Sequence, residues 1–448
     1  MSTQLFVWHH TARVGSLSLN EEGRWSFRYD PEWNAFALSP HLPIGDVCGD
    51  LAHQRTVEWF FDNLLPEGTL RLALANRAGI RDPNTWQLLS SYGQDTAGAL
   101  SILPNDVIPS AQQVYTPLPV ARLSEMIERS REGIPLMAQE GPLRMSLAGA
   151  QDKIALRFLP DGSFWLAEGS TPTTHILKPE NINKKYPFCP ANEWFCVSLA
   201  GAVGLKVPRV HLLSADGHRI YVIDRYDRRE TAQGIRRIHQ IDLCQARNVP
   251  PSRKYEDEAG LRADDLFATA RTCRVPAAAK SAAMSWMAFN YLIGNGDAHA
   301  KNISFLMTGG KPEPAPAYDL LCVDAYHHDR HLTMSIGGMN QAGWVEGCHW
   351  DAFALMHAID PRAMRTTLRR LVADLPAASE QLLASPALTP EEQEWLRSHV
   401  APVLKERMGF VATALTEPIH KDLLALQSRQ DVVPEDVLEA VRSVSAGR

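Results

Sequence analysis

The pattern of apolar and polar positions changes from strand-like to helix-like along the first part of the chain. Residues 4–30 alternate and are rich in β-forming side chains, with a polar turn at residues 20–23, which predicts a small antiparallel sheet. From Thr56 the apolar residues recur at helical spacing, so we predict a helix that Thr56 caps and Pro66 breaks. Four prolines within residues 104–119 then indicate the crossing to a second subdomain.

The second subdomain should contain two β-hairpins, each made of two apolar runs around an Asp-Gly turn. The paired runs are residues 154–158 with 164–166, and residues 207–213 with 219–223. The final third of the chain has the pattern of helices, and Thr389-Pro390-Glu391-Glu392 supplies an N-cap, a first-turn proline and a capping box. The predicted fold class is therefore α+β.

A polar run at residues 294–302 lies between two apolar segments. The upstream apolar residues recur at offsets typical of a buried helix face, and Gly294 and Gly296 would end that helix. Asp297 and Asn302 should therefore lie on a tight loop before a short strand. Their offset is that of the catalytic loop in protein-kinase-like enzymes, where the aspartate accepts the hydroxyl proton and the asparagine binds magnesium. The usual His-Arg lead-in is missing, and an ordinary Asx turn remains an alternative.

Three further positions suit a nucleotide site with magnesium. Asp319 follows a proline-broken segment, where a kinase has its second metal-binding group, and such oxygen donors suit a hard cation. Lys178 ends an apolar run, where a kinase keeps the lysine that holds the α- and β-phosphates; a solvated strand-end lysine is the alternative. Glu193 would pair with Lys178, although the dipole of its predicted helix alone also favours a glutamate there.

A run of small residues precedes the first predicted hairpin, and the second hairpin ends in a charged segment. The run consists of Ala148, Gly149, Ala150, Gln151, Asp152 and Lys153. Small side chains let backbone N–H groups approach a phosphate, but the run is no Walker A motif, and small-residue turns are common. At Asp224-Arg225-Tyr226 the chain leaves the sheet, where it would join two lobes around an adenine.

Composition bounds the class of protein. The chain has 448 residues, 45% of them hydrophobic and 21% charged, which is ordinary for a globular protein of two or three domains. A formal net charge of −6 argues against a nucleic-acid coat protein but leaves room for a basic patch. The seven scattered cysteines favour reduced thiols, and neither an export signal nor a long apolar run is seen, so we expect a soluble cytoplasmic protein.

Two clusters of cationic side chains carry weaker signals. The first is His327, His328 and His331, whose spacing favours a solvated loop over a metal site. The second is Arg362, Arg365, Arg369 and Arg370, which nearly share one helical face. These arginines would be able to touch DNA phosphates, although a solvated charged face is the simpler interpretation.

Together these pieces resemble the HipA-family toxin kinases of bacterial toxin–antitoxin pairs. The matching runs, in family order, are residues 146–153, 171–178, 224–228, 294–302 and 318–320. The resemblance, which extends to the family's full-length form, implies a two-lobed protein-kinase-like fold. Its parts would be an N-terminal β-rich subdomain with helices at residues 1–110, a kinase N-lobe at 111–228 and a mainly helical C-lobe at 229–448. The hinge reads Asp-Arg-Tyr here, where the family often has Glu-Arg-Phe.

The resemblance also implies ATP and Mg²⁺ as cofactors and a role for each site residue. Asp297 is the catalytic base, and Asn302 and Asp319 bind magnesium. The ATP-binding positions are Ala148 to Lys153, Lys178, Asp224, Arg225, Tyr226, His299 and Tyr318. Ser146 is the autophosphorylation site, where an added phosphate disfavours the closed loop beside the ATP phosphates and switches the kinase off.

The implied function is that of a toxin, a serine/threonine protein kinase that inhibits translation by phosphorylating an aminoacyl-tRNA synthetase such as the glutamyl enzyme. Its implied partners are a helix-turn-helix antitoxin and, through that antitoxin, operator DNA. Two alternatives remain open. One is a small-molecule kinase of the same fold, and the other is a catalytically idle co-repressor that acts with the antitoxin.

Overall fold

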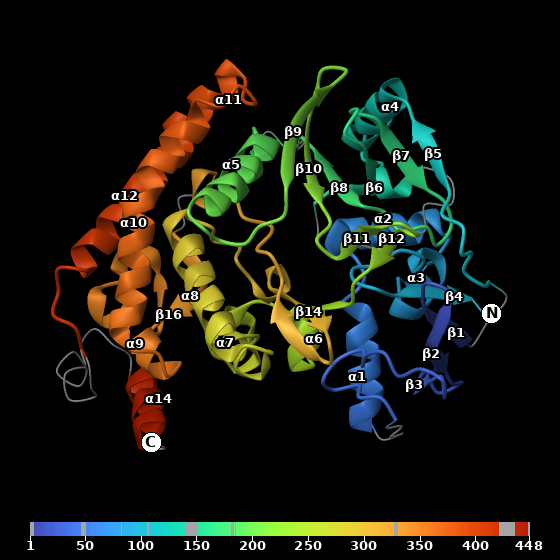
Figure 1. Cartoon of the computed structure of the whole chain (residues 1–448), viewed down its shortest axis with the longest axis horizontal. Coiled ribbons are helices and arrows are strands. Elements are labelled where there is room, and N and C mark those ends of the chain that lie inside the picture. The colour runs from blue at the N-terminus through green and yellow to red at the C-terminus, as the bar shows by residue number, and fades with distance from the viewer. Residues whose placement is uncertain are drawn as a thin grey trace. The chain divides into compact units, whose positions relative to one another are not determined.

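The computed structural model describes residues 4–45, 51–81, 83–104, 107–139, 151–180, 183, 185–326, 330–420 and 435–446 (Figure 1). These residues form two compact units. Unit 1 consists of Met1–Lys184, Pro208–Pro251 and Ser304–Ala315, and unit 2 consists of Lys185–Val207, Ser252–Ile303 and Pro316–Arg448. Both helices and antiparallel sheets are present, which confirms the α+β class. The three sequence-based domain ranges stay a prediction, because the two units interleave along the chain.

The N-terminal sheet of unit 1 has the strand order β3-β2-β1-β4. Its strands are β1 (Gln4–His9), β2 (Ala12–Leu19), β3 (Trp25–Tyr29) and β4 (Ser101–Pro104). The side chain of Asn20 accepts hydrogen bonds from the backbone of Glu22 (3.0 Å) and Arg24 (2.8 Å), and Gly23 has a φ of 75°. The predicted antiparallel sheet and its polar turn are therefore confirmed.

Three helices accompany this sheet: α1 (Leu51–Asp62), α2 (Gly68–Arg77) and α3 (Thr85–Tyr92). The predicted break is confirmed, because α1 ends before Pro66 and α2 starts at Gly68. The predicted cap is wrong, because Thr56 lies inside α1. Its hydroxyl instead accepts a hydrogen bond of 2.9 Å from the side chain of Asn248.

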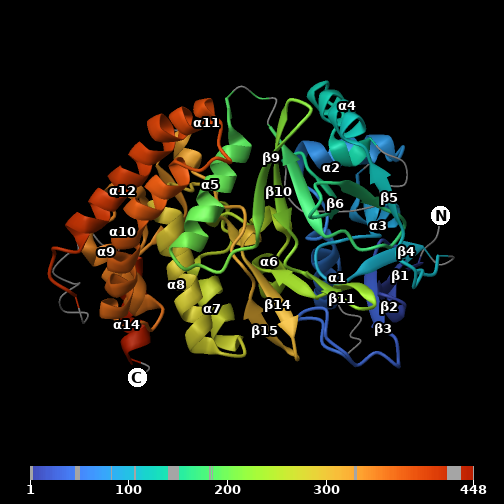
Figure 2. The ribbon, with the colours of Figure 1, turned by 45° about the horizontal axis from the view of Figure 1, so that its top comes forward.

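The central sheet of unit 1 has six strands in the order β5-β7-β6-β8-β10-β9, all of them labelled in Figure 1, and all neighbours are antiparallel. Figure 2 shows the edge strands β5 and β9 in a second view. The strands are β5 (Tyr115–Leu118), β6 (Ile154–Phe158), β7 (Phe164–Ala167), β8 (His175–Pro179), β9 (Val210–Ala215) and β10 (His218–Asp224). Both predicted hairpins are confirmed, with positive φ angles at Gly162 and Gly217 in their turns. Pro117 lies in the edge strand β5, where a missing N–H group is tolerated.

Smaller elements complete unit 1. They are α4 (Val120–Arg131), the 3₁₀ turns η1 (Leu136–Ala138) and η2 (Pro251–Arg253, at the boundary between the units), the pair β11 (Arg228–Thr231) and β12 (Gly234–Arg237), α6 (Leu243–Arg247), and the sheet of β13 (Gln240–Asp242), β14 (Ser304–Thr308) and β15 (Lys311–Pro314). β11 leads directly out of the segment that follows β10, so the chain leaves the central sheet where the sequence predicted.

Unit 2 is mainly helical. Its helices are α5 (Cys189–Ala202), α7 (Ala263–Thr272), α8 (Pro276–Leu292), α9 (Gly347–Met356), α10 (Pro361–Leu383), α11 (Pro390–Trp395), α12 (Ala401–Ala414) and α14 (Glu435–Ala446). Its shorter elements are η3 (Glu256–Glu258), η4 (Ala300–Asn302), η5 (Val323–Ala325), β16 (His331–Ile336), β17 (Met339–Gln341), η6 (Ala342–Trp344) and the π-helical turn η7 (Leu396–Val400). α8 is buried along most of its second half and packs against α7, α10 and α12.

In the C-terminal third, one sequence prediction is confirmed and one is corrected. The capping box at Thr389 is confirmed, because its hydroxyl accepts from Glu392 N and the Glu392 side chain accepts from Thr389 N. Arg365 is only 1% exposed and pairs with Asp351 through two contacts of 2.8 and 2.7 Å. It therefore cannot belong to a DNA-facing patch. No helix in the described part of the chain is both long and apolar enough to span a membrane.

Candidate active site

The loop at residues 294–302, which we call the catalytic loop, follows α8 as predicted. Gly294 has a φ of 66°, and a Cβ atom there would lie 2.6 Å from Cγ1 of Val403 and 2.9 Å from Oδ2 of Asp324. Only glycine suits both the left-handed backbone and this close packing. The loop then closes with η4 and continues into β14, so the predicted placement between a helix and a strand is confirmed.

Asp297 is held by both its backbone and its carboxylate. Its carbonyl oxygen accepts hydrogen bonds from the backbone of His299 (2.9 Å) and the side-chain amide of Asn302 (3.1 Å). Its carboxylate accepts one of 3.0 Å from the hydroxyl of Tyr255. Asp297 and Asn302, five positions apart in sequence, are therefore brought together in one turn. Such a carboxylate is suited to receive a proton from a bound hydroxyl group.

Asn302 and Asp319 offer the hard oxygen donors that a magnesium ion takes. Because the amide nitrogen of Asn302 donates to Asp297, its side-chain oxygen points to the opposite side of the amide group. Asp319 has the left-handed φ of 57°, and its carbonyl oxygen accepts a hydrogen bond of 3.4 Å from Asn295. A strained backbone at a polar residue is a common feature of functional sites. These donors fit Mg²⁺ in type.

His299 is buried, and within the described residues its Nδ1 atom has no hydrogen-bond partner. Burial first, and then the positive charge of Lys254, lowers the pKa of His299 to about 3, while nearby Asp319 acts in the opposite direction. The ring is therefore neutral at physiological pH. An orphaned ring nitrogen beside Asp319 suits a bound polar ligand, as expected for a nucleotide contact. Tyr318 donates a hydrogen bond of 2.6 Å to the carbonyl of Lys301, so its side chain also supports the loop.

A segment that the sequence did not reveal braces this loop. We call residues 254–257 the brace. Tyr255 packs edge-on against His299, with ring centroids 5.0 Å apart, and the carbonyl of Lys254 accepts from Ala300 N at 3.2 Å. Glu256 accepts two hydrogen bonds of 2.8 Å from Ser335 in β16. The run Lys-Tyr-Glu-Asp has no periodicity or motif that would have indicated this role.

Some of the residues predicted to contact the phosphates belong to the described part of unit 1. Lys178 is 7% exposed in β8, opposite Tyr221 of β10, and its Nζ lies 5.9 Å from the Tyr221 ring centroid. The carboxylate of Asp152 accepts from Ser130 and from the backbone of Leu136, so it fixes the turn after α4. Lys153 is buried directly before β6.

Several of the predicted residues lie outside the described part of the chain. Ser146, Ala148, Gly149 and Ala150 lie outside the described residues, as do His327 and His328. His331, the third member of that histidine cluster, instead contacts the carboxylate of Asp257 at 2.7 Å. Glu193 is 2% exposed in α5 of unit 2, and its pairing with Lys178 stays a prediction.

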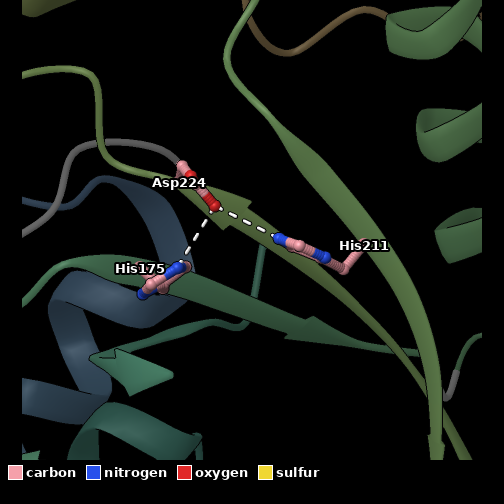
Figure 3. Close-up of side chains that lie close together, drawn as sticks. All are labelled: His175, His211 and Asp224. Carbon is pink, nitrogen blue, oxygen red and sulfur yellow. Dashed lines mark hydrogen bonds and ion pairs between the residues drawn. The ribbon is translucent and has the colours of Figure 1, made fainter. Parts of the chain in front are cut away.

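At the end of β10, Asp224 lies between two histidines from neighbouring strands (Figure 3). Its Oδ1 atom is 3.1 Å from Nε2 of His175 and 3.3 Å from Nε2 of His211. Burial raises the pKa of Asp224, but hydrogen bonds from His175 and His211 outweigh this and hold it below its usual range. The carboxylate is therefore ionised.

Three residues of this kind can hold a metal ion, but the hydrogen bonds favour another interpretation. The Nδ1 atom of His175 accepts the backbone N–H of Phe158 at 3.2 Å, so the ring proton lies on Nε2, the atom that faces Asp224. A metal ligand would require the reverse arrangement, with a proton on Nδ1 and a lone pair on Nε2. We therefore interpret the three residues as a hydrogen-bonded group that shapes the end of β10.

The side chain of Arg225 is directed into the protein rather than toward a ligand. It is 2% exposed and bonds to Asp227 (2.8 and 3.0 Å) and to Asp95 (3.3 Å). In the segment 224–226, which we call the hinge, the side chains of Asp224 and Arg225 are thus engaged within unit 1. Its backbone also bonds within unit 1, because the N–H groups of Asp224 and Arg225 donate to the carbonyls of Arg209 (2.9 Å) and Thr174 (2.8 Å). The adenine contact of this segment stays a prediction.

The chain is similar to known proteins over most of its length. A family model described as the HipA-like C-terminal domain matches residues 145–379, and one described as the HipA N-terminal domain matches residues 5–103. A putative kinase of Sinorhizobium fredii is 36% identical over 391 residues, which cover 85% of this chain and 91% of that protein. The serine/threonine-protein kinase toxin HipA of Shewanella oneidensis is 31% identical over 422 residues, which cover 89% and 94%.

A solved structure is also similar over nearly the whole chain. It is the complex of HipA, HipB and operator DNA from Shewanella oneidensis, which matches with a TM-score of 0.80 and 29% identity. The match covers 93% of this chain and 100% of that one. The expected kinase-like fold is therefore confirmed.

Proposed function

Because this chain belongs to the HipA family of serine/threonine kinase toxins, we propose that it transfers the γ-phosphate of ATP, with Mg²⁺, to a hydroxyl group of a target protein. The observation that carries this proposal is the catalytic loop. There the backbone of Asp297 is tied to Asn302, and its carboxylate is oriented by Tyr255.

Each residue of the site has a separate task in this reaction. Asp297 receives the proton of the attacking hydroxyl, and Asn302 and Asp319 hold the magnesium ion, which neutralises phosphate charge when bound. His299 and Tyr318 line the loop on the nucleotide side. In unit 1, Lys178 and the segment from Ala148 to Lys153 bind the phosphates, and the hinge of Asp224, Arg225 and Tyr226 lies against the adenine.

We further propose that the target is an aminoacyl-tRNA synthetase, with the glutamyl enzyme as the first candidate, so that translation stops. The partner would be a helix-turn-helix antitoxin that carries the kinase to its operator DNA. Family membership supports this assignment, as does the similarity to a HipA whose structure was solved with HipB and operator DNA. The predicted cytoplasmic location agrees with such a target.

Replacing Asp297 by asparagine tests the kinase proposal. The variant should lose phosphate transfer by at least about a thousandfold, and expression should no longer arrest growth, because the proton acceptor is gone. Phosphopeptides from cells that express each form would identify the target. The matched control is Asp374→Asn, an exposed aspartate of α10 with one long contact to Arg370, which should behave as wild type.

Labelling of proteins and metabolites with ATP, together with an ATP-binding assay, separates the alternatives. Transfer that persists in the Asp297→Asn variant would remove Asp297 from the mechanism. Labelled metabolites without labelled proteins would instead indicate a small-molecule kinase. ATP binding without any turnover in the wild-type protein would favour an idle co-repressor.

Autophosphorylation of Ser146 is proposed as the device that switches the kinase off. A phosphate there adds nearly two negative charges beside a segment that must approach the ATP phosphates, so the ATP-bound arrangement becomes unfavourable. Incubation with ATP should place phosphate on Ser146 and lower the activity with time, whereas Ser146→Ala should stay active. The control is Ser163→Ala, in the β6–β7 turn. An unmodified Ser146 in enzyme that nevertheless loses activity would contradict the proposal.

A further inference from the structure

A buried ion cluster in unit 1 joins the N-terminal subdomain to the strands that carry the proposed nucleotide contacts. Its members are Asp95, Asp227, Arg225, Arg228 and Arg237, and their side chains are only 2–5% exposed. Two carboxylates face three guanidinium groups, which leaves one excess positive charge. Asp95 comes from the turn between α3 and β4, whereas the other four residues come from the segment that follows β10.

Asp95 contacts all three arginines. Its carboxylate accepts from Arg225 Nη1 at 3.3 Å, from Arg228 Nη2 at 2.8 Å and from Arg237 Nη2 at 2.9 Å. Arg225 belongs to the hinge, and Arg228 closes the turn after it, since its backbone N–H donates to the carbonyl of Arg225 at 3.1 Å. One carboxylate therefore fixes both ends of the turn that carries the proposed adenine contacts.

Asp95 also fixes the start of the strand that carries Lys178. It accepts hydrogen bonds from the hydroxyl of Thr173 (2.6 Å) and from its backbone N–H (3.3 Å), directly before β8. The next residue, Thr174, accepts the backbone N–H of Arg225 at 2.8 Å. The hinge and the lysine strand thus meet at the same carboxylate.

The turn around Asp95 adds backbone contacts to the same segment. The carbonyl of Thr96 accepts from Arg225 Nη2 (2.8 Å) and from Arg228 Nη2 (3.2 Å). Gly98 donates to Asp227 (2.7 Å) and accepts from Arg228 Nη1 (2.8 Å). Gly98 has a φ of 80°, which suits glycine, and a Cβ atom there would lie 2.9 Å from Gln240 N. The backbone of the turn therefore packs directly against the backbone of β13.

Burying five charges is a costly way to gain stability, because well-packed apolar side chains serve equally well. The cluster instead fixes the orientation of its members, because the rigid, planar guanidinium groups donate hydrogen bonds only in fixed directions. We infer that Asp95 is a positioning residue for the nucleotide, which holds the hinge and the start of the Lys178 strand in their ATP-binding arrangement. This inference rests on the proposed ATP-dependent function and extends it to a residue of the N-terminal subdomain.

The test compares three variants of the full chain. Asp95→Asn removes the charge that holds the hinge and the lysine strand. Arg237→Met is the matched control, because within the described residues the Arg237 side chain bonds Asp95 and the carbonyl of Ser170 but no residue of the hinge or of β8. The double variant Asp95→Asn with Arg237→Met leaves one carboxylate and two guanidinium groups, and so restores the charge excess of the wild type.

The measurements are the Kd of a fluorescent ATP analogue, the KM for ATP, kcat and the midpoint of thermal unfolding. We expect Asp95→Asn to raise Kd and KM about tenfold and to change kcat less than about twofold. Arg237→Met should leave Kd near that of the wild type. The double variant should regain thermal stability but keep the raised Kd, which a merely structural role would not produce.

Two results would overturn the inference. One is a wild-type Kd and KM in Asp95→Asn, and the other is a double variant in which Kd recovers together with stability. If Asp95→Asn does not fold, the double variant carries the test against Arg237→Met. A wild-type protein that binds the analogue but transfers no phosphate would refute the kinase proposal alone, because Kd still tests Asp95. A wild-type protein that binds no nucleotide would overturn both.

Discussion

The catalytic loop of unit 2 and the hinge of unit 1 are fixed by different kinds of interaction. In the loop, hydrogen bonds and close packing dominate: Gly294 admits no side chain, and Tyr255 and Asn302 bond Asp297. At the hinge, charges dominate: Arg225 lies between the carboxylates of Asp95 and Asp227. The loop should therefore respond to changes of shape, and the hinge to changes of charge.

The difference matches what each region has to do. In the proposed reaction, the loop must place one carboxylate next to a hydroxyl, and small errors of position are costly in catalysis. The hinge must keep its backbone in one conformation while its own side chains stay out of the site, and buried ion pairs hold such a conformation in one arrangement. Changes of shape at the loop and changes of charge at the hinge test this difference.

The largest expected effect on stability comes from adding a methyl group to the catalytic loop. Gly294→Ala combines a left-handed φ with contacts of 2.6 and 2.9 Å, so we expect the free energy of unfolding to fall by about 2–4 kcal/mol and kcat to fall strongly. Urea unfolding and steady-state kinetics measure the two effects. The control is Gly310→Ala, which has a φ of 80° but no atom of the described residues within 4 Å of the added Cβ, and which should cost about 1 kcal/mol. Equal losses in both variants would contradict the packing argument.

A smaller effect is expected from the brace. Tyr255→Phe removes only the hydroxyl that orients the Asp297 carboxylate, so kcat should fall about tenfold while the KM for ATP stays near that of the wild type. The matched control is Tyr92→Phe, which removes a buried hydroxyl bonded to Leu74 O at 2.9 Å in unit 1 and should leave kcat unchanged. If Tyr255→Phe keeps full kcat, the brace supports the fold and not the reaction.

How much the sequence reveals also differs between the two regions. The catalytic loop is readable because α8 has a periodic apolar face, glycines follow it, and Asp297 and Asn302 lie only five positions apart. Asp95 gives no such signal, because its partners Thr173, Arg225 and Arg237 are 78, 130 and 142 positions away. Tyr255 is likewise 42 positions from Asp297. Local patterns predict elements and tight loops, whereas contacts between distant segments need the folded chain.

The two wrong predictions, for Thr56 and Arg365, also involve structure that the local sequence pattern does not show. Thr56 looked like a cap because the apolar periodicity begins beside it, but α1 starts five residues earlier, at Leu51. Arg365 looked like a surface charge because it shares a helical face with other arginines. Its partner Asp351, in α9, turns it into a buried ion pair, and no local pattern distinguishes the two cases.

The smallest expected effect is a difference in acid sensitivity that comes from the ion cluster alone. Burial raises the pKa of Asp95, but Arg228, Arg225 and Arg237 together outweigh burial and hold it below the usual value. A depressed folded-state pKa contributes stability that is complete above the unfolded-state pKa of about 3.9 and is lost as the pH falls below it. Between pH 5 and pH 3 the wild type should therefore lose about 1 kcal/mol more stability than the double variant Asp95→Asn with Arg237→Met.

Urea unfolding at each pH measures this difference. The Gly294→Ala variant serves as the control from the other region. It should start from a lower stability but lose as much as the wild type between pH 5 and pH 3, because the ion cluster of unit 1 is unchanged in it. Parallel curves for the wild type and the double variant would show that Asp95 is not held as a carboxylate by its arginines. An altered acid loss in Gly294→Ala would show that the shape-based and charge-based regions are not independent.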